Sequence, residues 1–246
     1  MDSAIQLYSL RNVEQPLDAI LEAVADAGFS GVEFAYRVVD EDAEAIAKTL
    51  EETGLSVAGA HVRIDPLEAE FEETVAFYET LGCESFVIPA MDEEYFASRE
   101  GIQEAIDRLE PIAEQLTERG LSLHYHNHTH EYTQLDGTTG FDVFIEQSDI
   151  GIQVDGGLAL LAGDDPVERV RSLGDRARLA HLKDVDTESG TSVPVGTGDL
   201  DVEAFSAAFR EVGGEWLIYE YEGGDPLASL SEDADRVNAL CRGEPL

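Results

Sequence analysis

Four residues that can bind a metal ion lie near the ends of four consecutive β-rich segments in the second half of the chain. They are His126, Asp155, His181 and Glu220. Two imidazoles and two carboxylates make a mixed nitrogen and oxygen donor set, which suits one divalent metal ion such as Mn²⁺, Co²⁺, Mg²⁺ or Zn²⁺. Because the set contains no thiolate and is expected to leave coordination positions open, we interpret it as a catalytic site rather than a structural one.

The alternation of side chains along a β-strand supports this grouping. Residues two apart lie on the same face of a strand, so His124, His126 and His128 share one face of the fifth β-rich segment. By the same rule, Lys183 lies on the face of His181 in the seventh segment. Lys183 is one of only two lysines in the chain, and we expect a lysine retained at such a position to take part in the site.

Short β-rich runs alternate with amphipathic helical stretches from one end of the chain to the other. We predict β-strands over residues 5–10, 31–35, 56–61, 85–89, 121–127, 150–155, 178–184 and 215–220. Helices are predicted near residues 16–27, 41–53, 66–81, 98–119, 140–148, 165–173, 202–212 and 226–241. The eight units average about 31 residues each in the 246-residue chain, which is typical of the βα repeats of a parallel sheet.

A closed barrel is the simplest arrangement of eight such units. We therefore predict a single-domain (β/α)8 TIM barrel that spans residues 1–246. A doubly wound open sheet is the structural alternative, but its first strand is usually followed by a Gly-rich phosphate-binding turn, and the segment 8–11 contains no glycine. In a barrel enzyme the reacting groups lie at the carboxyl ends of the strands, so we expect the four possible ligands to converge there.

The composition excludes several kinds of partner. The chain has 53 acidic and 15 basic residues, for a formal net charge of -38 at pH 7. This charge repels phosphate groups, so we expect neither a nucleic-acid partner nor binding to a membrane. Only two cysteines occur and no signal peptide is visible, which favours a cytoplasmic protein. The acidic surface and the scarcity of lysine resemble proteins of halophilic archaea, and we expect the fold to loosen in dilute buffer.

A series of short motifs follows the same order along the whole chain. The motifs are Gln6-Leu7-Tyr8-Ser9-Leu10-Arg11, Gly31-Val32-Glu33, Ala60-His61-Val62, Tyr125-His126-Asn127-His128, Asp155-Gly156-Gly157, His181-Leu182-Lys183-Asp184, Gly196-Thr197-Gly198-Asp199-Leu200-Asp201 and Glu220-Tyr221-Glu222. Together they resemble the sugar phosphate isomerase/epimerase family of xylose isomerase-like TIM barrels. The resemblance implies one divalent metal held by residues of strands five to eight, commonly Glu, Asp, His and Glu.

The fifth strand departs from that pattern. Asp155, His181 and Glu220 match the last three ligands that the resemblance implies, whereas His126 stands where those enzymes have a glutamate. Glu131, in the loop that follows, is the alternative ligand. This departure weakens the case for a proton-transfer mechanism that uses two glutamates.

The resemblance also implies a type of reaction. A metal that binds two adjacent oxygens of a sugar acidifies the C–H bond between them and stabilises the enediolate formed when a base takes that proton. Return of the proton gives isomerisation or epimerisation, whereas loss of a β-hydroxyl gives dehydration. We therefore predict a metal-dependent isomerase or epimerase for a sugar or cyclitol, with a dehydratase or lyase for a keto-sugar or keto-inositol as the alternative.

Two further functions are less favoured. A non-catalytic sugar-binding barrel would bind the metal without turnover. The related apurinic endonucleases need a basic DNA groove and more ligands, and Leu158 stands where a further histidine ligand is expected.

The resemblance suggests roles for the remaining polar residues. Glu220 is expected to act as both ligand and proton-transfer base, with Glu131 or His61 as the second acid or base. Lys183 is expected to stabilise developing oxyanion charge. Four further residues are expected to bind the substrate, namely Glu33, Arg11, His128 and Glu222. For Glu33 the alternative is an ion pair inside the barrel.

A phosphate group on the substrate is not favoured. Arg11, Arg63 and Lys183 are the cations placed to meet one, and the only obvious Gly-rich cradle lies at residues 196–198. We therefore expect an unphosphorylated small molecule. Barrels of the family often pair, so a homodimer is one expectation for the assembly.

Overall fold

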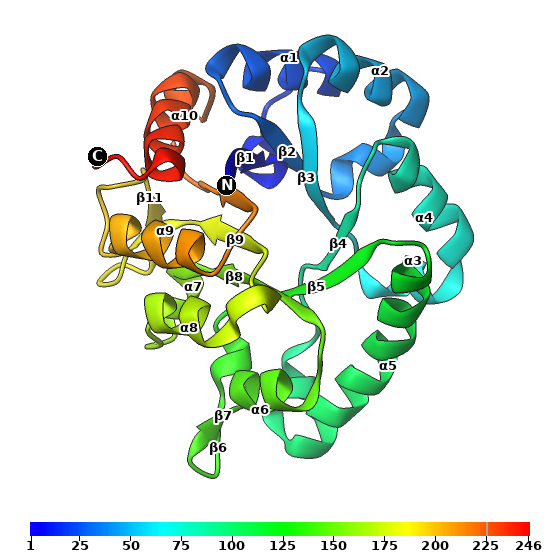
Figure 1. Cartoon of the computed structure of the whole chain (residues 1–246), viewed down its shortest axis with the longest axis vertical. Helices are drawn as coiled ribbons and strands as arrows, with labels where there is room; N and C mark the ends of the chain where they lie inside the picture. The colour runs from blue at the N-terminus through cyan, green and yellow to red at the C-terminus, as the bar shows by residue number, and fades with distance from the viewer. Residues whose placement is uncertain (225) are drawn as a thin grey trace.

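Eight parallel strands close into a barrel in a computed structural model that describes residues 1–224 and 226–246 (Figure 1). The order around the barrel is β1-β12-β9-β8-β5-β4-β3-β2. The strands are β1 (Asp2–Gln6), β2 (Gly31–Phe34), β3 (Ser56–His61), β4 (Ser85–Ile88), β5 (Ser122–His126), β8 (Gly151–Asp155), β9 (Leu179–Leu182) and β12 (Trp216–Tyr219). The prediction of a single TIM barrel is confirmed.

Helices form the outer ring of the barrel (Figure 1). They are α1 (Leu17–Ala27), α2 (Ala43–Thr53), α3 (Ile64–Ala69), α4 (Phe71–Thr80), α5 (Arg99–Glu118), α6 (Gly140–Gln147), α7 (Gly156–Leu161), α8 (Pro166–Leu173), α9 (Val202–Glu211) and α10 (Pro226–Arg242). The longest, α5, begins where the Ser98 hydroxyl accepts the N–H of Gly101. It buries Ile102, Ile106 and Leu109 at helical spacing, so its apolar stripe faces the strands.

Short elements fill the connections. They are the 3-10 helices η1 (Leu7–Leu10), η2 (Tyr36–Asp40), η3 (Glu93–Ala97), η4 (His130–Tyr132) and η5 (Gly174–Arg176), and the hairpins β6 (Gln134–Leu135) with β7 (Thr138–Thr139) and β10 (Asp184–Asp186) with β11 (Thr191–Val193). Both hairpins are antiparallel and lie outside the barrel sheet. Within the part of the chain that the structure describes, no helix is long and apolar enough to cross a membrane.

The first strand differs from the prediction over residues 5–10. β1 ends at Gln6, and the chain then turns into η1, where the side-chain oxygen of Gln6 accepts the N–H of Tyr8. Leu7 and Leu10 are buried in this turn. Hydrophobic periodicity cannot distinguish a strand from a buried turn in a short apolar run. The prediction therefore extended the strand too far.

The helix predicted over residues 66–81 is two helices, α3 and α4. They meet at Glu70, whose backbone angles (φ -139°, ψ 45°) lie outside the helical region. α3 buries Leu67 and α4 buries Val75. These two positions are eight residues apart. In one continuous helix of 3.6 residues per turn, their side chains would point in directions that differ by about 80°. The break therefore allows both side chains to reach the core.

The interior of the barrel is layered along its axis. Near the amino ends of the strands, a small apolar cluster includes Leu179 and Ile218. Two residues further along the same strands, on the same face, stand His181 and Glu220. The barrel thus has an apolar floor beneath a polar layer. Gly59 leaves room in that layer, because a Cβ there would lie 3.2 Å from a carboxylate oxygen of Glu33.

Acid is expected to destabilise this fold in part through His124, which is buried in the middle of β5. Burial and the charge of Arg178 lower the pKa of His124 to about 4 from the usual 6.5. Because the folded pKa is depressed, this stability is present above pH 6.5 and is lost as the pH falls toward 4, about 2 kcal/mol of it between pH 7 and 5. Urea unfolding in molar KCl should show a smaller pH dependence for His124→Gln than for the wild type. Equal pH dependence of the two proteins would refute this expectation.

Candidate active site

Four potential metal ligands meet at the carboxyl ends of four neighbouring strands. His126 ends β5, Asp155 ends β8, His181 lies in β9 and Glu220 follows β12. One ligand atom from each of the four lies within 4.8 Å of the others, and all four side chains are buried. The convergence expected from strand alternation is therefore present.

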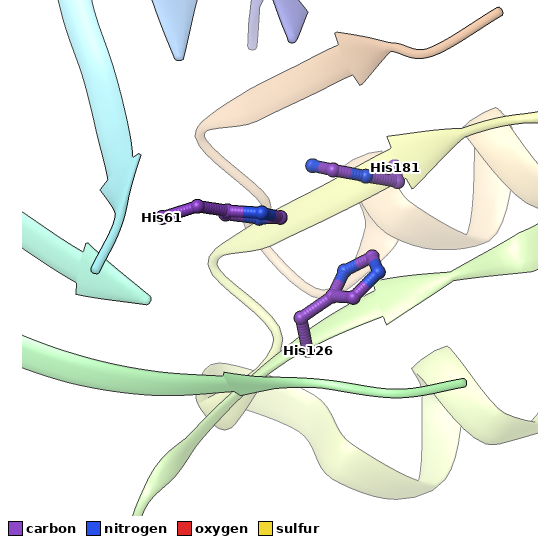
Figure 2. Close-up of side chains that lie close together, drawn as sticks. All are labelled: His61, His126 and His181. Carbon is purple, nitrogen blue, oxygen red and sulfur yellow. The ribbon is translucent and has the colours of Figure 1, made fainter. Parts of the chain in front are cut away.

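His61, at the end of β3, brings a third imidazole to this cluster. Figure 2 shows the rings of His61, His126 and His181 directed toward one another from three strands. The ring of His61 stacks on that of His181, with centroids 5.2 Å apart and planes inclined by 8°. Burial lowers the pKa of His61. This ring is therefore neutral at pH 7.

One carboxylate oxygen of Asp155 has no hydrogen-bond partner among the residues that the structure describes. Oδ1 accepts the N–H of Leu158 at 2.7 Å and so caps the first turn of α7. Oδ2 is buried without a partner and lies 4.0 Å from Nε2 of His126. Burial raises the pKa of Asp155 to about 6. A buried carboxylate oxygen is costly without a donor or a cation, and a divalent ion would satisfy both Asp155 and His126, so the donor set fits a metal.

His181 is held between two carboxylates. Its Nδ1 lies 2.9 Å from Oε2 of Glu220, and its Nε2 lies 2.6 Å from Oε2 of Glu33. Burial disfavours the charged ring, but the two carboxylates outweigh it and raise the pKa of His181 to about 10. Burial raises the pKa of Glu220, but the hydrogen bond from His181 and the charge of Lys183 outweigh burial and bring the pKa of Glu220 well below the usual value. Glu220 is therefore ionised at neutral pH.

A cavity of about 470 Å³ opens above the cluster. Its charged or titratable lining side chains are Tyr8, His61, Arg63, His126, His128, Lys183, Glu220 and Glu222. The ammonium group of Lys183 pairs with Glu222 and lies 3.6 Å from Oε1 of Glu220. Burial lowers the pKa of Lys183, but Glu220 and Asp155 outweigh it and raise the pKa above its ordinary value. Lys183 thus presents a fixed positive charge to the cavity.

His128 lies higher in the same cavity. Its side chain is 39% exposed, and its Nδ1 has no hydrogen-bond partner within the described part of the chain. Burial of the ring and the nearby charges of His130 and Lys183 lower the pKa of His128 to about 4. The ring is therefore neutral at pH 7 and lines the cavity.

Glu33 lies beneath the cluster and not in the cavity. Its side chain is fully buried, and its carboxylate accepts hydrogen bonds from Gln6 at 2.6 Å, Gln153 at 2.5 Å and His181 at 2.6 Å. Burial raises the pKa of Glu33, but its interactions with His61 and His181 outweigh the effect of burial and lower the pKa. The partners of Glu33 are thus the protein's own donors, which favours the alternative of an ion pair inside the barrel over a contact to substrate hydroxyls.

Arg11 also lies behind the cavity wall. Its guanidinium group stacks on the ring of Tyr8 at 4.1 Å and donates to Oε2 of Glu222 at 3.2 Å. Arg11 is absent from the lining of the cavity, whereas Glu222 is part of it. Through this contact Arg11 supports Glu222, which itself lines the cavity.

Glu131 is turned away from the metal-binding cluster. It is fully buried, accepts the hydroxyl of Tyr125 at 2.8 Å and the N–H of His128 at 2.7 Å, and lies 3.2 Å from Nε2 of His130. Tyr125 lies on the opposite face of β5 from His126, and its hydrogen bond holds the Glu131 carboxylate away from the face that carries the cluster. Among the described residues, His126 and not Glu131 is the fifth-strand member of the donor set.

Two residues with a place in the site were missed by sequence reasoning. Gln153 bonds through its side-chain oxygen to His61 at 2.9 Å and His126 at 3.1 Å. Asn127 accepts the N–H of Asp155 at 2.9 Å and fixes the end of β8. Gln153 lies two residues before Asp155 on the same strand face, and this spacing was the available signal.

The Gly-rich loop at residues 196–198 already holds a carboxylate. Oδ2 of Asp184 accepts the N–H groups of Gly196 at 2.9 Å, Thr197 at 3.1 Å and Gly198 at 2.8 Å. A Cβ on Gly198 would lie 2.3 Å from Oδ1 of Asp184, so the loop can close on the carboxylate only with glycine there. These N–H groups are engaged and do not form a phosphate cradle.

A closed parallel barrel with buried imidazoles and carboxylates at the carboxyl ends of its strands defines the active-site architecture of a TIM-barrel enzyme. The chain belongs to the xylose isomerase-like TIM barrel family, whose model matches residues 21–240. It is 24% identical over 270 residues to an inosose dehydratase of Geobacillus thermodenitrificans, covering 93% of this chain and 90% of that protein.

Solved structures show the same fold. A sugar phosphate isomerase/epimerase from Parabacteroides distasonis superposes with a TM-score of 0.81 at 21% identity, covering 96% of this chain and 97% of that one. A probable 3-DHS dehydratase from Bacillus anthracis superposes with a TM-score of 0.77 at 16% identity, covering 97% and 99%. Proteins that share this fold are therefore named for both kinds of reaction that the sequence suggested.

Proposed function

We propose that the protein binds one divalent metal ion at His126, Asp155, His181 and Glu220 and removes a proton next to the carbonyl of a sugar or cyclitol. The unpartnered oxygen of Asp155, amid four donor atoms within 4.8 Å of one another, is the observation that carries this proposal. A bound ion would polarise the carbonyl and the neighbouring hydroxyl of the substrate. The cavity of about 470 Å³ lies within the size range of small-molecule sites.

Three residues that line the cavity have separate roles in this reaction. Glu220 is ionised and lines the cavity, so it serves as the base that takes the proton. Lys183 stabilises the negative charge that develops on the substrate oxygen, because its ammonium group is buried and permanently charged. Glu222 holds Lys183 in place and is itself held by Arg11.

Dehydration is the outcome that the cavity favours. Epimerisation at one carbon needs a second proton carrier on the opposite face of the substrate, and in two-glutamate epimerases that carrier is a carboxylate. Here Glu131 is turned away and Glu222 is paired with two cations. Elimination needs one base, because the proton that Glu220 takes from carbon can pass to the departing hydroxyl, which leaves as water. The relative named inosose dehydratase agrees with a keto-cyclitol or keto-sugar as substrate.

An isomerase or epimerase is the second candidate. The neutral imidazoles of His61 and His128 line the cavity and can accept a proton. Mass spectrometry in deuterated buffer distinguishes the two reactions on a panel of keto-inositols and ketohexoses. Loss of 18 Da corresponds to dehydration. Deuterium at carbon with no loss of water would overturn the dehydratase and support the isomerase or epimerase. Metal binding with neither change would overturn both in favour of a non-catalytic barrel.

Metal binding is expected to release a proton from His181. The pKa of His181 is raised to about 10, so Nδ1 carries a proton at neutral pH and must lose it before it can bind an ion. Protons compete less as the pH rises, so the affinity for Mn²⁺ should increase roughly tenfold per pH unit between pH 6.5 and 8.5. Titration calorimetry in two buffers of different protonation enthalpy counts the protons released. An affinity that is flat across this range would argue against Nδ1 as the ligand atom.

A further inference from the structure

A layer of hydrogen bonds lies directly beneath the four ligands, and each bond in it has a direction. Glu33 is at its centre, with Gln153 between Glu33 and two of the imidazoles. An ionised carboxylate only accepts hydrogen bonds, so every group that contacts Glu33 must donate to it. This single constraint determines the orientation of the side chains around it.

The orientation of Gln153 follows first. Its side-chain nitrogen donates to Oε1 of Glu33 at 2.5 Å, and its side-chain oxygen therefore faces the opposite way. That oxygen lies 3.1 Å from Nδ1 of His126 and 2.9 Å from Nε2 of His61. Because an amide oxygen only accepts, both ring nitrogens must carry hydrogen.

The tautomers of the two imidazole ligands follow next. With its proton on Nδ1, neutral His126 has its lone pair on Nε2, the atom that lies 4.0 Å from the unpartnered oxygen of Asp155. His181 donates from Nε2 to Oε2 of Glu33 at 2.6 Å, so its Nδ1, beside Glu220, is the atom left for an ion. The two rings thus use opposite nitrogens, and one buried carboxylate sets both.

We propose that Glu33, directly and through Gln153, fixes the tautomers of His181 and His126 so that one ligating nitrogen of each ring faces the metal site. This inference rests on the proposed metal site. Glu33 and Gln153 are positioning residues, since neither lines the cavity. Outer partners of this kind orient a ligand ring and typically change metal affinity by 10–100-fold.

The same layer explains the three-histidine group. His61, His126 and His181 also lie close enough to hold an ion by themselves. However, Nε2 of His61, Nδ1 of His126 and Nε2 of His181 all donate to Gln153 or Glu33. Once His181 has released its Nδ1 proton, each ring keeps its one remaining hydrogen on these nitrogens, which therefore have no lone pair for a metal. We infer one ion per chain and not two.

The test compares metal affinity with imidazole tautomers. Co²⁺ binding is measured by calorimetry in molar KCl for the wild type, Glu33→Gln and Gln153→Met, both of similar size to the residue replaced. We expect roughly 10–100-fold weaker binding in each variant. Gln6→Met is the matched control, because the hydrogen bonds of the Gln6 side chain join Oε2 of Glu33, at 2.6 Å, and the N–H of Tyr8 rather than either ligand ring. Its affinity should stay within about threefold of the wild type on the same reasoning.

Imidazole ¹⁵N spectra of the metal-free protein give a second readout. We expect His126 as the Nδ1–H tautomer in the wild type and a shift toward Nε2–H in Gln153→Met. An Nε2–H ring in the wild type, unchanged affinity in both variants, equal weakening by Gln6→Met, or two bound ions would each overturn the inference. A wild type that binds no ion would overturn the proposed function instead, and the ¹⁵N spectra would still decide the tautomers.

Discussion

Replacement of Glu220 by glutamine is expected to lower kcat/KM by about 1,000-fold or more and to weaken metal binding. The carboxylate meets three requirements at once. It is a candidate ligand in the four-residue cluster, it accepts a hydrogen bond from His181 at 2.9 Å, and it lies 3.6 Å from the ammonium group of Lys183. An amide keeps the shape of the side chain but neither its charge nor its basicity, so the loss should appear mainly in kcat.

Steady-state kinetics on a converted keto-inositol, together with elemental analysis of the purified protein, measures this effect. Glu215→Gln is the matched control, since Glu215 lies just before β12, is exposed and pairs with Arg178 on the surface. We expect kcat/KM of this variant within about twofold of the wild type, because exposed ion pairs contribute little. If Glu220→Gln kept more than about a tenth of the activity, Glu220 would not be the base.

Salt is expected to have the second large effect, on stability. The chain carries a formal net charge of -38 from 53 acidic and 15 basic residues. Several arginines already contact two carboxylates, as Arg119 does with Glu72 and Glu79. The acidic side chains nevertheless far outnumber the basic ones, so many of them have no cation to pair with. The screening length is about 10 Å at 0.1 M salt and about 3 Å at 1 M, so repulsion between neighbouring surface carboxylates falls steeply over this range.

We expect the thermal midpoint to rise by roughly 10–20 °C between 0.1 and 2 M KCl, which corresponds to about 5 kcal/mol for a chain of this size. Differential scanning calorimetry measures the midpoint. The double variant Glu110→Lys/Glu114→Lys, on the exposed face of α5, removes four units of negative charge and should show a smaller rise. A midpoint that does not change with KCl, or an identical rise in the variant, would contradict charge repulsion as the cause.

The sequence predicted which strand residues face the barrel interior, but not how deep along the barrel axis each of them lies. Strand alternation correctly placed His126, Asp155 and His181 on inward faces, because the period of two is a local property of the backbone. Alternation does not give depth, however. Glu33 and Gln153 also face inward, but they lie one layer below the ligands, and only the closed register of the strands determines that layer.

Residues in loops were harder to place than residues in strands. Glu131 follows β5 by five residues, and no period relates its side chain to the barrel interior. It bonds to Tyr125 on the outer face of β5, a contact that depends on the path of the loop through η4. Arg11 follows β1 in the same way and supports Glu222 from behind the cavity wall.

The sequence by itself determined the barrel, the convergence of the four candidate ligands and the inward position of Lys183, because these depend on periods of two and 3.6 residues and on repeat length. Only the tertiary structure decided which acidic residue reaches the site and which stays in the supporting layer. That choice depends on hydrogen bonds between strands far apart in sequence, such as the bond between Glu33 and Gln153 across 120 residues. No local pattern of side chains contains that information.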